Sequence, residues 1–161
     1  MKAKTTYIAI AVGVGIVALA IFYTYSADQG RLRGQYFGNS LQAIQDDLKQ
    51  TQNEFYSQKT MLDEKTITPE EFASFADTHI KKMEEILARY DTLNPPESFT
   101  KSVEFFKLST QKQIESDQLF IDWIKTNDTT NKIRSDLLLQ DSFESEMAGL
   151  AAYNKAKNNA G

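Results

Sequence analysis

The apolar residues of this chain form one long uncharged run, followed by segments with helical spacing. No charged residue lies in segment 5–27. At a rise of 1.5 Å per residue, roughly 20 apolar residues span a hydrocarbon core of about 30 Å. Tyr7 lies at one edge of the run and Tyr25 at the other, as is typical of the aromatic belts at membrane surfaces. We therefore predict that residues 1–27 are a short tail and a transmembrane helix.

A cleaved signal peptide is the alternative for this run. Signal peptides carry apolar stretches of only about 7–15 residues and end at small side chains. The run is longer, and Tyr23, Thr24 and Tyr25 make a poor cleavage site, although Ser26-Ala27 would be permitted. The sequence therefore favours a signal anchor that is retained in the cell membrane.

Basic residues flank the predicted span on both sides. Lys2 and Lys4 precede it, and Arg31 and Arg33 follow it. The positive-inside bias favours a cytoplasmic N-terminus only narrowly. The acceptor pattern for N-glycosylation at Asn127 falls in a predicted turn and agrees with an extracytoplasmic C-terminal domain.

Small residues within the span are candidates for packing against another membrane helix. Ala9 and Ala11 each precede a glycine by four residues, at Gly13 and Gly15. Such pairs allow helix backbones to approach closely in lipid, although glycine and alanine are also common in membrane helices generally. We predict the lipid bilayer and other integral membrane subunits as partners.

Four helical segments follow the span. Gly30, Gly34 and Gly38 indicate a hinge over residues 28–38, because glycine weakens helices. The first helix is predicted from about Gln35 to Asp63. The second begins at a capping box, Thr68-Pro69-Glu70-Glu71, and ends near Leu93-Asn94 before two prolines. The third runs from Pro96 to about Thr126, and the fourth follows the capping residues 127–130.

Each segment places apolar residues on one face. In the fourth segment, these are Ile133, Leu137, Leu138, Phe143, Met147, Leu150, Ala151 and Tyr153. Short connections make sequential helices antiparallel neighbours, and Pro95-Pro96 argues against one long coiled coil. The predicted fold is all-α: one N-terminal transmembrane helix, an antiparallel up-down four-helix bundle over residues 35–157, and a disordered tail over 158–161.

The amino-acid composition limits the kinds of functional site that the chain can form. The chain has no cysteine, one histidine and a net charge of −4. Disulfides, Fe–S clusters and thiol catalysis are therefore excluded, and the absence of a basic stripe argues against nucleic acid as a partner. His79 lies on an apolar face, and no Glu-x-x-His motif accompanies it. We predict a hydrogen-bonded core histidine and neither catalytic residues, cofactor nor metal.

Polar residues interrupt the apolar stripes of the last two segments. They are Thr110, Gln113 and Asp117 on the third, and Gln140 and Glu144 on the fourth. We interpret them as solvated residues at the bundle edge. The alternative is an inward-facing polar pocket, in which Asp117 and Glu144 would act as an acid–base pair only if a cleft perturbs their pKa values.

Two predicted turns and the predicted span resemble segments of known membrane proteins. Leu93-Asn94-Pro95-Pro96 and Trp123-Ile124-Lys125-Thr126-Asn127-Asp128 resemble turns of small single-span proteins of archaea and bacteria. The lysine-rich start and the Ile/Val/Ala/Gly span look like sequences of ammonia-oxidising archaea. This resemblance implies a non-catalytic accessory subunit of a membrane complex such as ammonia monooxygenase. The bundle is also similar to four-helix sensory domains of bacterial receptors, which implies an independent extracytoplasmic ligand-binding or sensor domain. An enzyme is the third interpretation.

Overall fold

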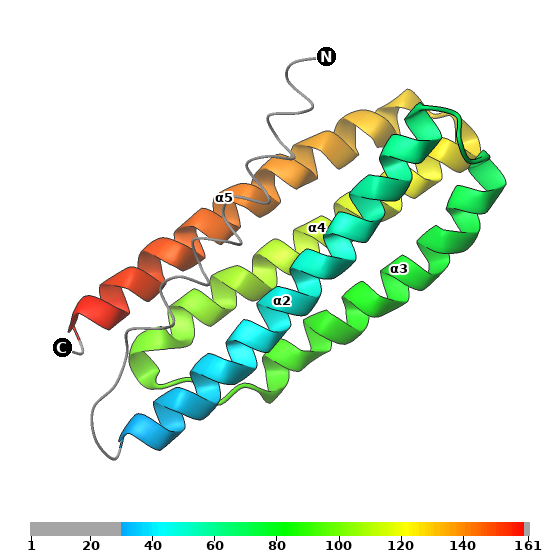
Figure 1. The fold of residues 1–161 in the computed structure, drawn as a ribbon. Coiled ribbons are helices and arrows are strands. Elements are labelled where there is room, and N and C mark those ends of the chain that lie inside the picture. The colour runs from blue at the N-terminus through cyan, green and yellow to red at the C-terminus, as the bar shows by residue number, and fades with distance from the viewer. Residues whose placement is uncertain (1–29, 160–161) are drawn as a thin grey trace.

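The computed structural model describes residues 30–159, with side chains from Gly34 onward. This part forms four long helices, two 3-10 turns and no strand: α2 (Gly30–Asp63), α3 (Pro69–Arg89), η1 (Tyr90–Thr92), η2 (Glu97–Phe99), α4 (Thr100–Thr126) and α5 (Thr129–Asn159). Successive helices run antiparallel, so that α2 and α4 begin at the end where α5 finishes (Figure 1). The predicted antiparallel bundle is thereby confirmed in its all-α character and its four helices.

The predicted transmembrane run and its small-residue pairs lie outside the described residues. None of the helices formed by residues 30–159 combines the length and the apolar character that crossing a bilayer requires. The membrane span and its orientation therefore stay predictions from the sequence.

The start of α3 agrees with the sequence signal in atomic detail. The Thr68 hydroxyl accepts a hydrogen bond from the Glu71 backbone N–H at 3.2 Å, and the Glu71 carboxylate accepts one from the Thr68 N–H at 2.8 Å. Pro69 occupies the first turn, where its missing N–H costs nothing. The capping box is therefore confirmed.

Other helix ends differ from the prediction. α2 begins at Gly30 and passes through Gly34 and Gly38, where the sequence suggested a hinge and a later start. The nearby Phe37 and Leu41 are almost fully buried, and their burial offsets a glycine cost of up to about 1 kcal/mol per residue. α3 gives way to η1 before the predicted end, and α5 includes residues 158–159, which were assigned to the tail.

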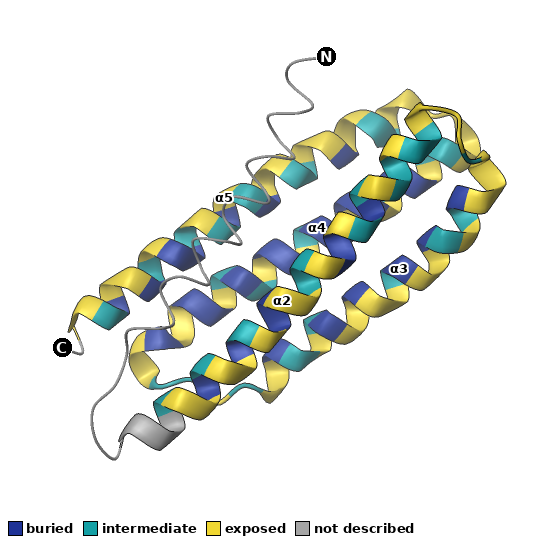
Figure 2. Cartoon of the chain, viewed as in Figure 1, coloured by how far each residue is buried: buried dark blue, intermediate teal, exposed yellow. Residues whose placement is uncertain are grey.

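The core consists of two apolar clusters at different heights of the bundle. Figure 2 shows the buried positions on the inner faces of the helices. The cluster nearer the α2 start contains Phe37, Leu41, Ile44, Ile86, Tyr90, Phe99, Val103, Phe106, Leu150, Tyr153 and Ala156. The cluster at the other end contains Phe55, Phe72, Ala76, Phe120 and Ile121. Polar side chains lie between the two clusters.

Small residues allow α4 and α5 to approach closely. Every seventh residue of α4 along one stripe is a buried serine, Ser102, Ser109 and Ser116. The facing stripe of α5 is Ser135, Ser142, Gly149 and Ala156. The hydroxyls of Ser109 and Ser142 lie 3.1 Å apart, and those of Ser116 and Ser135 lie 3.2 Å apart. This small-residue seam joins α4 and α5 through far more contacts than any other described helix pair has.

The seam rotates the buried side of α5 away from part of the apolar face that was predicted for it. Of the apolar face predicted for it, Leu150 and Tyr153 are buried, but Ile133, Leu137 and Met147 are 60%, 58% and 45% exposed. That part of the prediction is wrong. The face toward α4 is occupied by serine, glycine and alanine, so the large apolar side chains on the opposite side of the helix point outward.

We expect Thr68→Ala to lower the free energy of unfolding by about 1 kcal/mol, because the Glu71 N–H loses its cap. Thermal unfolding of the full-length chain in detergent, followed by circular dichroism, measures the change. Thr78→Ala, at an exposed position inside α3, is the matched control. Equal stability of the two variants would show that the cap contributes nothing.

A second prediction concerns the seam. A Cβ atom at Gly149 would lie 2.8 Å from Cδ1 of Phe106. Gly149→Leu should therefore destabilise the bundle by about 1–3 kcal/mol despite the better helix propensity of leucine. Ala151→Leu, on the exposed side of α5, should change stability by less than about 0.5 kcal/mol. Urea unfolding compares the two, and a tolerated leucine at 149 would contradict close packing.

Candidate functional site

Three polar side chains from α2, α3 and α4 meet in the layer between the two apolar clusters. Nε2 of His79 lies 2.8 Å from Oδ2 of Asp117, and the Gln52 amide donates to the same oxygen at 3.0 Å. The His79 side chain is fully buried, and that of Asp117 is 4% exposed. The prediction of a hydrogen-bonded core histidine is confirmed.

The His79 ring is packed closely within this layer. The imidazole stacks on Phe55 with centroids 4.2 Å apart, and its Nδ1 has no hydrogen-bond partner among the described residues. The Asp117 carboxylate has only acceptor oxygens, so His79 donates its Nε2–H to Oδ2. Nδ1 of His79 and Oε1 of Gln52 are the two buried side-chain atoms within residues 34–159 that lack a hydrogen-bond partner.

A second hydrogen-bond chain lies closer to the α2 start. The Gln45 amide donates to the Tyr90 hydroxyl at 2.8 Å. The Thr110 hydroxyl lies 3.3 Å from the Tyr90 hydroxyl and 3.1 Å from the carbonyl oxygen of Phe106. Because threonine has one hydroxyl proton, the consistent order is Gln45 to Tyr90, Tyr90 to Thr110, and Thr110 to the carbonyl. Burial raises the pKa of Tyr90, so the phenol keeps the proton that it donates.

The polar interruptions of the last two helices divide between core and surface. Thr110, Gln113 and Asp117 of α4 are buried, so the interpretation of a solvated edge is wrong for them. Gln140 and Glu144 of α5 are exposed, as predicted. The contacts of α4 with both α3 and α5 bury more of its surface than one apolar stripe covers. Asp117 and Glu144 therefore do not form the acid–base pair considered from the sequence.

Two charged residues of the interior were missed from the sequence. Glu146 is half-buried, and burial raises its pKa from 4.5 to about 7. Lys59 is also half-buried, with Nζ 3.7 Å from the centroid of the Phe120 ring, and burial lowers its pKa to about 8 while Asp117 opposes the shift. The burial of Glu146 was indicated in the sequence only by its spacing, since it lies three residues after Phe143 and therefore on the same side of the helix.

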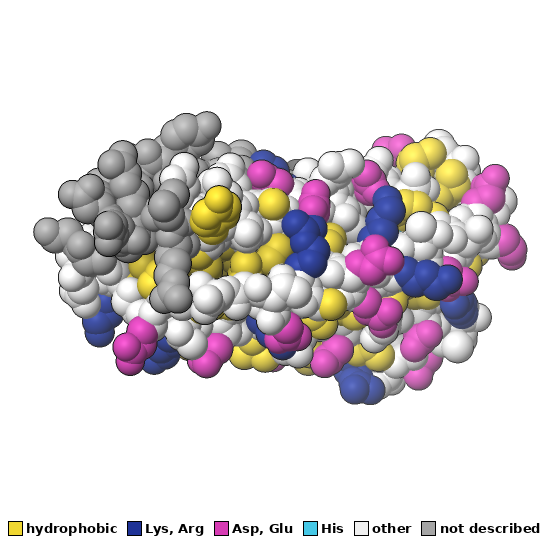
Figure 3. All heavy atoms as spheres, turned by 90° about the horizontal axis from the view of Figure 1, so that it is seen from below, with side chains coloured by type: hydrophobic (Ala, Val, Ile, Leu, Met, Phe, Trp, Pro, Cys, Tyr) yellow, Lys and Arg dark blue, Asp and Glu magenta, His cyan; other side chains and the backbone are white. Residues whose placement is uncertain are grey.

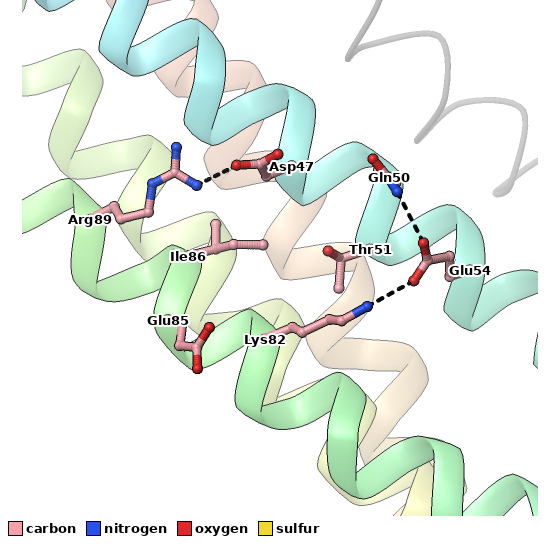
Figure 4. Close-up of a pocket in the computed structure, with 8 residues that line it drawn as sticks. All are labelled: Asp47, Gln50, Thr51, Glu54, Lys82, Glu85, Ile86 and Arg89. Atoms are coloured by element: carbon pink, nitrogen blue, oxygen red, sulfur yellow. Dashed lines mark hydrogen bonds and ion pairs between the residues drawn. The ribbon is translucent and has the colours of Figure 1, made fainter.

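An open surface cleft of about 280 Å³ lies between α2 and α3. Figure 4 shows its two cross-helix ion pairs, Asp47 with Arg89 and Glu54 with Lys82. Its lining comprises Asp47, Gln50, Thr51, Glu54, Lys82, Glu85, Ile86 and Arg89. Exposed pairs of this kind contribute little to stability, at most about 1 kcal/mol each. The surface in Figure 3 likewise mixes acidic and basic side chains rather than gathering one sign of charge.

Asn127 ends α4 in the left-handed conformation, with φ of 57°, and is exposed. The Asp128 carboxylate accepts a hydrogen bond from the Thr130 N–H at 2.9 Å and caps the next helix. The predicted glycosylation position therefore lies on an accessible turn. Among the side chains of residues 34–159, no group of three or more histidine, aspartate or glutamate residues is placed to hold a metal ion.

Comparison with protein families, with curated proteins and with solved structures finds no match to this chain. Its function is therefore inferred from its own residues.

We expect Asp117→Leu to lower stability by about 3 kcal/mol, because the N–H donors of His79 and Gln52 lose their shared acceptor. Adding His79→Phe should recover part of the loss, since one buried donor disappears. Glu115→Leu, at an exposed position of α4, is the control. Urea unfolding decides the matter, and an unchanged midpoint in Asp117→Leu would show that the layer is not structural.

Proposed function

We propose that this chain is a non-catalytic accessory subunit of a membrane protein complex, anchored by one N-terminal transmembrane helix and presenting its helical bundle outside the cytoplasm. The observation that carries the proposal is the orientation of α5. This helix buries small side chains against α4 and leaves Ile133 and Leu137 more than half exposed. Exposed apolar patches of this kind are typical of surfaces that bind a partner.

Burial of Ile133 and Leu137 against a partner would contribute favourably to the free energy of binding. Full burial of an exposed side chain of this size contributes about 1.5–3 kcal/mol, and covering the 60% and 58% that remain exposed here would contribute roughly 1–2 kcal/mol for each, enough for the centre of a modest interface. The two residues are four apart on α5 and therefore lie one above the other on the same face. Met147 is a further exposed apolar side chain of α5, ten residues along the helix from Leu137.

The position of this surface favours protein over lipid. α5 begins at the end of the bundle opposite to the start of α2 (Figure 1). α2 follows directly on the predicted span, and a helix of 34 residues is about 50 Å long. Ile133 and Leu137 would thus lie far from the bilayer, where another subunit is the available partner.

The resemblance of the span to sequences of ammonia-oxidising archaea makes ammonia monooxygenase a candidate for the complex. An independent ligand-binding or sensor domain is the second candidate. The half-buried Lys59 and Glu146 support it, because strongly shifted pKa values are found more often at functional sites than elsewhere.

We expect the double substitution Ile133→Ser and Leu137→Ser to release the chain from its complex in mild detergent without unfolding the bundle. Native gel electrophoresis of extracted membranes measures the release, and circular dichroism checks the fold. Lys81→Ser with Glu84→Ser, on the exposed face of α3, is the matched control.

The same gel separates the alternatives. The double substitution Gly13→Leu and Gly15→Leu tests whether the predicted span, rather than α5, makes the decisive contact, because release of this variant from the complex would assign the contact to the span. Migration of the wild-type chain alone, as a monomer or dimer, would contradict the accessory-subunit proposal and favour the independent domain.

A further inference from the structure

The outer side of α5 carries a second stripe with the spacing of a coiled coil. Its positions follow one another at steps of three and four residues, and all of them are exposed: Thr130, Ile133, Leu137, Gln140, Glu144, Met147, Ala151 and Asn154. Alternating steps of three and four place side chains along the line on which one helix packs against another. We call these eight residues the outer stripe of α5.

The outer stripe lies opposite the small-residue seam. Ser135, Ser142 and Gly149 of the seam repeat every seven residues and are buried against α4. Among the long helices formed by residues 30–159, α4 is the one with extensive contacts to α5. α5 therefore uses one helix-packing face inside the bundle and presents a second one on its surface.

The order of side chains along the outer stripe is complementary to itself. A second copy of α5 can be laid antiparallel to the first, with the two-fold axis level with Ser142. Leu137 of one copy then faces Met147 of the other, and Ile133 faces Ala151. Each apolar side chain of the stripe thus meets an apolar one, and a large side chain meets a small one in the Ile133 layer. The remaining layers pair Gln140 with Glu144 and Thr130 with Asn154.

The position of Glu144 selects this alignment over its alternatives. The Gln140 layer sets an amide donor against the Glu144 carboxylate, which accepts hydrogen bonds. A shift of the antiparallel copy by seven residues would set Glu144 against Ile133 or Met147, according to its direction. A parallel pair in register would set Glu144 against the same carboxylate of the other copy, and like charges that face each other are unfavourable.

We propose that the outer stripe of α5 binds the outer stripe of a second copy of this chain, as an antiparallel helix pair with its two-fold axis level with Ser142. Each contact then occurs twice, as in any isologous interface. This inference rests on the proposed function in one respect, which is that the outer face of α5 is an interface. It adds the identity of the occupant, the register and the direction.

The pair is expected to be weak in dilute solution. Residues 130–154 make a contact about 36 Å long, and one helix from each side covers less than the standard interface of about 1,600 Å². Asp141 lies beside the axis and faces its own copy, although Lys112 of the same chain, 3.8 Å away, offsets the repulsion. Anchoring in a membrane would strengthen the pairing, because it raises the effective concentration of the chains.

The antiparallel direction also determines where the predicted anchors emerge. α2 begins at the end of the bundle where α5 finishes (Figure 1), so the two α2 helices of a pair begin at opposite ends. Bundles that stand upright on the membrane would therefore pair across two facing membranes. Detergent leaves both anchors free to take these positions, so the full-length chain in detergent is suited to the test.

Spin labels on single cysteines measure the pairing directly, since the chain has no cysteine of its own. Arg134→Cys and Lys155→Cys carry the label at exposed positions beside the outer stripe, eight and thirteen residues from Ser142. Double electron–electron resonance should show inter-chain separations along the helix of roughly 24 Å and 39 Å, which is twice each offset at 1.5 Å per residue. A parallel pair would give the same short distance at both positions. That result, or the absence of any inter-chain distance, would overturn the proposal.

Charge substitutions test the register. Leu137→Glu sets a charge against Met147 of the second copy and should weaken self-association at least about tenfold, as measured by analytical ultracentrifugation. Met147→Lys should weaken it similarly. An equimolar mixture of the two variants should associate again, because the two introduced charges have opposite signs and face each other. Leu108→Glu, at an exposed apolar position of α4, is the matched control and should associate like the wild type.

Circular dichroism checks that each variant keeps its helical fold. Undiminished association of folded Leu137→Glu, as pairing through the predicted span would give, contradicts the proposal. Failure of the folded variants to associate in the mixture contradicts the register.

The accessory-subunit proposal and the pairing proposal fail in different ways. Purified chains that pair with the expected distances, but migrate in no larger complex, would support the pairing and contradict the accessory subunit. Release of Ile133→Ser with Leu137→Ser from a larger complex, together with purified wild-type chains that do not pair, would support the accessory subunit and overturn the pairing.

Discussion

The close approach of α4 and α5 is the constraint on which the rest of the bundle depends. Two serine pairs bridge the helices, and the hydrogen of Gly149 faces the Phe106 ring at a distance that admits no side chain. Because the inner stripe of α5 is small, this helix contributes few large side chains to the core, chiefly Leu150 and Tyr153. The apolar volume comes instead mainly from the phenylalanines and aliphatic residues of α2, α3 and α4. The exposed face of α5 and its sparse contact with α2 follow from the same packing.

The layer around Asp117 adds specificity to this packing. A buried carboxylate is costly unless donors surround it, and only one vertical alignment of α2, α3 and α4 brings Gln52 and His79 to the same oxygen. Displacing one of these helices by a turn, about 5.4 Å, would leave the charge unpaired between aromatic rings. The apolar clusters on either side supply most of the stabilisation, and the polar layer selects their register.

Much of the fold was readable from local signals, whereas the site was not. The cap at Thr68 acts within a few residues, so it located the start of α3 without knowledge of neighbours. The prolines at 95–96 located the break between α3 and α4, but not the residues at which these helices end and begin. Which side of α5 is buried depends on the shape of α4. The α5 sequence offers two possible buried faces, one of small residues that recur every seven positions and one of larger apolar residues. Asp117 was assigned to solvent for a related reason: a lone polar residue in a stripe reveals neither its depth nor its partners.

The small-residue seam also affects the order in which the helices pack during synthesis. α4 and α5 are joined by a turn of only two residues, 127–128, so their many contacts close a short loop at small entropic cost. α2 and α3 are synthesised earlier, but they lack the tightly fitting surface that the later pair provides. This difference in contacts predicts that the C-terminal hairpin forms first and that α2 and α3 then pack against it. Until that hairpin has been synthesised, the apolar faces of α2 and α3 have no partner to cover them. The period before the hairpin is complete is therefore the time at which this domain most needs protection from aggregation.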